Sequence, residues 1–118
     1  MSADQGKRRI ILHIGTHKTG STTIQAGLKA NRRMLLRYGI DYPQMGVVGQ
    51  GHHNIAFDLA DHRWYIPAFG GFTRLVQHIH RSVVPTTIIS AEQFSRLSDQ
   101  QIARLAEPLA PCVRIVVA

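Results

Sequence analysis

The feature that most constrains the fold is a short apolar run that ends at a glycine and leads into hydroxyl side chains. The run Ile10–Ile14 reads IILHI, and Gly15 follows it directly. It is short and rich in β-branched residues, which predicts a buried strand. A helical pattern starts at about Ser21. A strand that leads through glycines into a helix can surround an anion with unpaired backbone amides. We therefore expect a ligand-binding turn here.

The rest of the chain alternates between helical and strand patterns. Two further apolar runs, Thr86–Ile89 and Cys112–Val117, predict strands, and Ile40–Pro43 is expected to be extended. Helical spacing predicts one helix from Ser21 to Tyr38, a short one over His52–Ala60, one over Phe72–Val83 and one that starts with the capping box Ser98–Gln101. The expected buried positions on the three longer helices are Ile24, Leu28, Leu35, Phe72, Leu75, Val76, Ile79, Val83, Ile102, Leu105, Ala106 and Leu109.

The order strand, helices, strand, helix, strand predicts an α/β domain. Its nearly continuous apolar strands favour a parallel sheet covered by helices on both faces, a three-layer α/β/α arrangement. The sequence ends on an apolar strand, so we expect the domain to be truncated after its third strand. Residues 1–9 form a basic tail, and residues 10–118 form the N-terminal part of the domain.

Charge and composition narrow the function classes. The 118 residues carry 14 Lys and Arg against 7 Asp and Glu, a net charge of +7 that favours phosphate or sulfate ligands. The net charge is the sole argument for a nucleic-acid-binding module, because the cations are scattered along the chain and form no basic stripe. We therefore expect no nucleic-acid partner. Cys112 is the single cysteine, which excludes an internal disulfide. No apolar run is long enough to span a membrane or form a signal peptide, so a cytoplasmic protein is expected.

The turn after the first strand has the residues of a phosphate-binding loop. Gly15 and Gly20 have the spacing of the two glycines in the Walker A motif, but Ser21 occupies the lysine position and Lys18 precedes the second glycine. No strand leads into a Walker B aspartate. Because the glycine spacing matches, a nucleotide kinase or nucleotide hydrolase with a variant loop is an alternative, although the displaced lysine and the missing aspartate argue against it.

The segment ILHIGTHKTGSTTIQ resembles the 5′-phosphosulfate-binding loop of the sulfotransferase superfamily, and GHHNIAFDL and TTIISAEQF resemble bacterial members in the same order. The resemblance implies a P-loop-like fold and transfer of a sulfuryl group from 3′-phosphoadenosine 5′-phosphosulfate (PAPS) to an unknown hydroxyl or amine acceptor, without a metal. It also implies that Lys18 contacts the leaving 5′-phosphate. The residues expected to bind PAPS are Thr16, His17, Lys18, Thr19, Gly20, Ser21, Thr22 and Thr23.

A sulfuryl transfer also needs a base that takes the proton of the acceptor. The resemblance allows either a histidine or a glutamate in this role. His53 and Glu92 are equal candidates, and His52 comes close behind them. The superfamily binds the 3′-phosphate with an Arg and a Ser in a motif that would begin just past Ala118. An inactive remnant without that site is thus a further alternative.

Other polar and aromatic side chains are expected to be structural. A zinc site formed by His52, His53 and His62 lacks regular ligand spacing, and no metal is expected. A further group of residues is expected to have a structural role: His13, His78, His80, Trp64, Tyr65 and Cys112. For Trp64 and Tyr65 the alternative is that they line an acceptor pocket.

Overall fold

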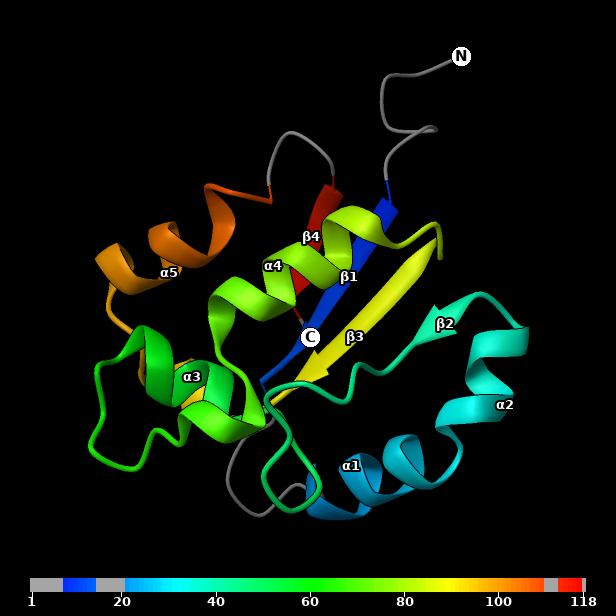
Figure 1. The fold of residues 1–118 in the computed structure, drawn as a ribbon, viewed down its shortest axis with the longest axis horizontal. Helices are drawn as coiled ribbons and strands as arrows, with labels where there is room; N and C mark the ends of the chain where they lie inside the picture. Colours follow the sequence, from blue (N-terminus) through cyan, green and yellow to red (C-terminus); the bar gives the residue numbers. More distant parts are fainter. Residues whose placement is uncertain (1–7, 15–20, 110–112, 118) are drawn as a thin grey trace.

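The computed structural model describes residues 8–14, 21–109 and 113–117, and its centre is a parallel β-sheet (Figure 1). The strands are β1 (Arg8–His13), β2 (Ile40–Asp41), β3 (Thr86–Ser90) and β4 (Val113–Val117). Their order is β2-β3-β1-β4, and all pairs are parallel. The expected α/β class and parallel sheet are confirmed. The extended segment after Gly39 adds a fourth, two-residue strand to the three that were expected.

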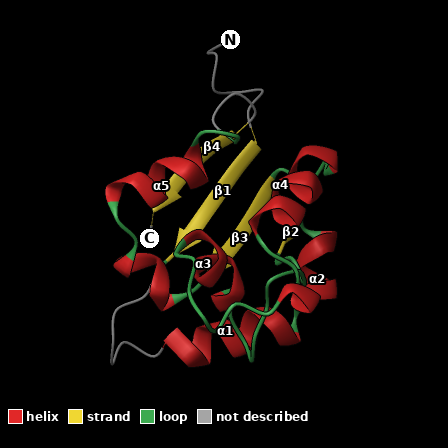
Figure 2. Cartoon of the chain, turned by 60° about the vertical axis from the view of Figure 1, so that its left-hand side comes forward, coloured by secondary structure: helices red, strands yellow, loops and turns green. Residues whose placement is uncertain are grey.

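The helices that pack on the sheet lie mainly on one of its two faces. The α-helices are α1 (Ser21–Ala30), α2 (Arg32–Arg37), α3 (His53–Leu59), α4 (Phe72–Arg81) and α5 (Asp99–Ala106), with 3-10 turns η2 (Pro67–Phe69) and η3 (Glu92–Arg96). Figure 2 shows α3, α4 and α5 in front of the strands. The core contains Ile10, Leu12 and Ile89 from the sheet, and from α3 to α5 it contains Ile55, Leu59, Leu75, Ile79 and Leu105. Burial of these side chains is the main force that holds the helices on the sheet.

The prediction of one helix from Ser21 to Tyr38 is wrong, because the segment is divided at Asn31 into α1 and α2. Asn31 has φ −101° and ψ 16°, and its side-chain amide donates to the carbonyl of Gly27 at 2.8 Å. Such a local bond competes with the helical backbone pattern. The expected burial is also wrong here: Ile24 is 47% exposed, whereas its neighbour Gln25 is 3% exposed.

Two other helices differ from the prediction at their apolar positions. Helix α4 ends at Arg81, because Ser82 is extended and the chain then approaches Pro85, so Val83 is exposed rather than buried. On α5, Leu105 is buried as expected, but Ile102 is exposed. The capping box is confirmed, since the Ser98 and Gln101 side chains bond each other's backbone amides.

The side chains expected to be structural have mixed outcomes. His78 Nε2 bonds the Asp41 carboxylate at 2.5 Å and so joins α4 to β2, while His80 donates to the carbonyl of Pro108. Trp64 is 59% exposed, which contradicts packing under a loop, and it lies against Phe57 and His62. Cys112 lies outside the described residues.

Candidate active site at the carboxyl edge of the sheet

The central strands β1 and β3 end side by side in a buried polar cluster. His13 is paired in register with Ser90, and its Nδ1 lies 2.7 Å from the Ser90 hydroxyl. Gln25 of α1 donates to the same hydroxyl at 3.0 Å. The Ser90 hydroxyl therefore bonds both side chains at once. A single side chain therefore connects β1, β3 and α1.

His52 connects this cluster to the segment between β2 and α3. Its ring is fully buried. Nδ1 accepts from the backbone amide of Ser90 at 3.1 Å, so Nε2 carries the proton and donates to the carbonyl of Pro43 at 2.7 Å. Burial lowers the pKa of His52 to about 4. The ring is neutral near pH 7, and both of its nitrogens are engaged, which favours a structural role.

A glycine allows the close approach of these elements. A Cβ built on Gly51 would lie 2.8 Å from the Gln25 amide group and 2.8 Å from the carbonyl oxygen of Ser90. The backbone amide of the next residue, His52, bonds that same carbonyl oxygen. Any side chain at position 51 would therefore push α1 or the end of β3 away from the cluster.

His53, the first residue of α3, has a different environment from His52. It is partly buried, and its Nδ1 bonds the side-chain oxygen of Gln93 in η3 at 2.5 Å. Because an amide oxygen only accepts, Nδ1 carries the proton and Nε2 has a free lone pair. None of the described side chains bonds Nε2. An imidazole that is oriented through one nitrogen and open at the other has the geometry of a general base.

Glu92 lies at the start of η3, directly after β3 and Ala91. Its side chain is partly buried, and it is the sequence neighbour of the Gln93 that orients His53. Glu92 therefore lies in the same turn as the residue that bonds His53. The backbone amide of Ala91 bonds the carbonyl of His13, which keeps this turn at the end of β1.

The predicted PAPS-binding residues are described only in part. Thr16, His17, Lys18, Thr19 and Gly20 lie outside the described residues. Ser21 and Thr22 form the beginning of α1, and Thr23 is exposed on that helix. The predicted helix start at Ser21 is therefore confirmed.

Sequence reasoning missed Gln25 and Ser90 as members of the site. Ser90 ends a strand whose other residues are apolar or β-branched, and its register partner His13 is the one polar residue in its own apolar run. The polar residues at the ends of two apolar strand patterns could therefore have indicated that Ser90 belongs to the site. Gln25 gave no such signal, because the apolar Ile24 next to it was the better candidate for burial.

Comparison of the chain with models of protein families, with curated proteins and with solved structures finds no match. Within residues 8–14, 21–109 and 113–117, no group of three or more His, Cys, Asp or Glu side chains could hold a metal ion. No helix in this part of the chain is long and apolar enough to cross a membrane.

Proposed function

We propose that this chain belongs to a PAPS-dependent sulfotransferase, with the P-loop-like fold that the sequence resemblance implies. The proposal depends on one observation. The strand β1, which leads into the segment Gly15–Thr23, lies at the centre of a parallel sheet, and an oriented imidazole, His53, lies beside the end of its neighbour β3. Ligands of open parallel sheets bind at this edge.

In this proposal each residue has a distinct role. Bound PAPS supplies the sulfuryl group, whose bond to the 5′-phosphate oxygen breaks as the acceptor oxygen or nitrogen bonds the sulfur. His53 Nε2 takes the acceptor proton, while its Nδ1–H stays bonded to Gln93. In the role that the sequence resemblance implies for it, Lys18 would stabilise the charge that develops on the leaving phosphate, together with the backbone amides at the start of α1. Glu92 is the alternative base.

The binding half of the proposal is tested by calorimetry with 3′-phosphoadenosine 5′-phosphate, the product that retains both phosphates. We expect binding by the chain, and at least tenfold weaker binding by Lys18→Ala, because the point charge on the phosphate is lost. Lys7→Ala removes the same charge outside the loop and is the matched control. Absence of binding, or equal losses in both variants, contradicts the proposal. Tighter binding of ATP with Mg²⁺ would favour the nucleotide kinase alternative.

A further inference from the structure

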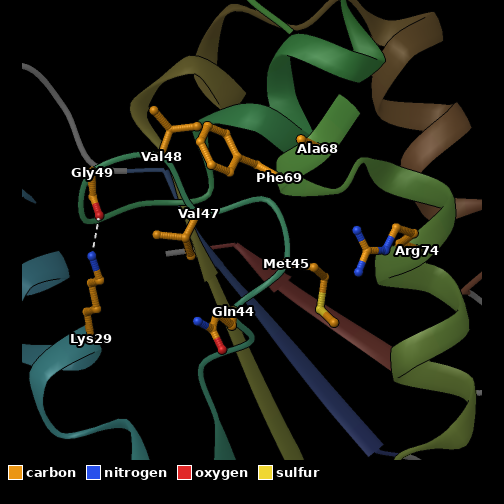
Figure 3. A pocket seen from close by; sticks show the side chains of 9 residues that line it. All are labelled: Lys29, Gln44, Met45, Val47, Val48, Gly49, Ala68, Phe69 and Arg74. Atoms are coloured by element: carbon orange, nitrogen blue, oxygen red, sulfur yellow. Dashed lines mark hydrogen bonds between the residues drawn. The ribbon is translucent and has the colours of Figure 1, made fainter. Parts of the chain in front are cut away.

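A cavity of about 530 Å³ lies beside the candidate active site and is not used by the proposed chemistry (Figure 3). Its volume is within the range of sites for small molecules. It is formed by four parts of the chain: α1, the segment between β2 and α3, η2 and α4. Its lining residues are Lys29, Gln44, Met45, Val47, Val48, Gly49, Ala68, Phe69 and Arg74.

The wall shared with the active site is fixed in place. The segment 44–51 runs from the cavity to Gly51, which contacts the polar cluster at Ser90. Its backbone is held by bonds from the Gly46 amide to the Phe69 carbonyl and from the Val48 amide to the Gly51 carbonyl. The ammonium group of Lys29 donates to the Gly49 carbonyl at 2.8 Å (Figure 3). This wall of the cavity is therefore held in place, and the same segment continues to the polar cluster at Ser90.

The chemistry of the lining is mixed in a specific way. Met45, Val47 and Phe69 supply an apolar surface, and Phe69 is 49% exposed. The charged residues that line the cavity are Lys29 and Arg74, both cations, and no carboxylate is among the described lining residues. The ion pairs among the described residues involve neither side chain. Figure 3 shows the two cations on different sides of the cavity, with Arg74 extending from α4 toward Met45.

We infer that this cavity binds a small anionic amphiphile, a molecule with an apolar body and one negatively charged group. The apolar body fits against Met45, Val47 and Phe69, and the anion pairs with the guanidinium of Arg74, which offers a planar fork of donors. Lys29 has two ammonium protons beyond the one that bonds Gly49. Such a ligand would be the sulfuryl acceptor if it also has a hydroxyl or amine, and that role rests on the proposed function, whereas its binding does not.

The test uses two probes that differ in charge, 6-hydroxy-2-naphthoate and its neutral methyl ester. The chain is labelled with ¹³C at the methionine methyl groups and titrated with each probe by NMR. Met45 lines the cavity, whereas Met34 is on α2, half exposed and outside it. We expect the naphthoate to shift the Met45 methyl signal and not that of Met34. The ester should need at least tenfold higher concentration.

Substitutions separate the charge from the shape of the cavity. Arg74→Gln should weaken binding of the naphthoate about tenfold and leave binding of the ester unchanged. Arg81→Gln, on the same helix but outside the cavity, should change neither. Val47→Trp fills the cavity and should abolish the effect of both probes on Met45. The inference is overturned if Met45 does not shift, if both probes bind equally, or if Arg74→Gln binds the naphthoate as tightly as the unaltered chain.

The same samples distinguish this inference from the proposed function. If 3′-phosphoadenosine 5′-phosphate binds and the naphthoate does not, the cavity assignment fails alone. If the naphthoate binds and the nucleotide does not, the sulfotransferase proposal fails and the cavity remains an anion-selective site.

Discussion

The two adjacent histidines before and at the start of α3 show how environment divides the roles of identical side chains. His52 is fully buried, with Nδ1 and Nε2 both bonded to backbone groups. His53 is partly exposed, with Nδ1 bonded to Gln93 and no bond to Nε2 from the side chains that the structure describes. A proton can be accepted at His53 without breaking a bond, whereas at His52 it would displace the Ser90 amide. The pair therefore combines one structural imidazole, His52, and one whose geometry fits the proposed base, His53.

The proposed base gives the first prediction. His53→Gln should lower the release of 3′-phosphoadenosine 5′-phosphate from PAPS, with water as the acceptor, by about 10²-fold or more, since a positioned base contributes roughly 10²–10⁴. Binding of the nucleotide should not change. His80→Gln, an exposed histidine on α4, is the control and should keep full activity. Equal rates in the two variants would show that His53 is not the base.

In the proposed reaction Gln93 is a positioning residue that acts through its bond to His53. Gln93→Leu removes the acceptor for Nδ1–H, so kcat should fall while KM stays unchanged. Gln93→Glu restores an acceptor oxygen and should recover most of the rate. A loss that Glu does not recover would mean that Gln93 acts only through packing.

The buried imidazole gives the second prediction, a loss of stability in mild acid. The pKa of His52 is about 4 in the fold and 6.5 as its ordinary value. Between these values the unfolded chain binds a proton that the folded chain does not, so stability is complete above pH 6.5 and falls as the pH drops toward 4. The loss from this group is at most about 3 kcal/mol. Urea unfolding at pH 7.5 and 5.0 measures it.

His52→Asn retains an acceptor near the Nδ1 position but cannot titrate. The variant should be less stable at pH 7.5 and should lose less stability between pH 7.5 and 5.0 than the unaltered chain. If the pH dependence is unchanged in His52→Asn, another group causes it. This comparison uses the change with pH, so the overall cost of the substitution does not affect it.

At the scale of single elements, the strands and capping signals were predictable and the burial of helix faces was less so. The runs of β1 and β3 have few alternatives to a strand, and the Ser98–Gln101 box defines a helix start through local bonds alone. The exposure of Ile24 was not predictable, because it depends on Gln25 reaching Ser90, 65 residues away. The bond between His53 and Gln93 was hidden for the same reason, since it joins residues 40 apart in sequence.

The third prediction concerns Gly51 and Gly27, at which substitution by alanine should change the free energy of unfolding in opposite directions. Gly51→Ala should destabilise the fold by about 1–3 kcal/mol, because the new methyl group would meet Gln25 and the carbonyl of Ser90. Gly27→Ala, in the exposed part of α1 with no atom within 4 Å of a built Cβ, should stabilise it by about 0.5–1 kcal/mol. Thermal or urea unfolding of both variants measures the difference. Two changes of the same sign would contradict the packing described around Gly51.

At the scale of the whole molecule, the sheet order explains how distant segments form one edge. β1 lies between β3 and β4, so the last residues of β1 and β3 lie side by side although more than seventy positions separate His13 from Ser90. The segment 44–51 then links this edge to the cavity beside α4. A nucleotide at the edge and an anionic acceptor in the cavity would thus be held by one continuous wall.

The net charge of +7 gives the last prediction, because it is distributed over the chain rather than gathered in one stripe. If the protein contacts four phosphates of a single-stranded oligonucleotide, its affinity for that oligonucleotide should fall about 50-fold between 50 and 200 mM salt. The reason is that such binding depends on the release of counterions. Binding of 3′-phosphoadenosine 5′-phosphate to a localised loop should fall less than about fivefold over the same range. Fluorescence anisotropy and calorimetry measure the two. Oligonucleotide binding that persists at 200 mM salt would instead favour a nucleic-acid-binding module.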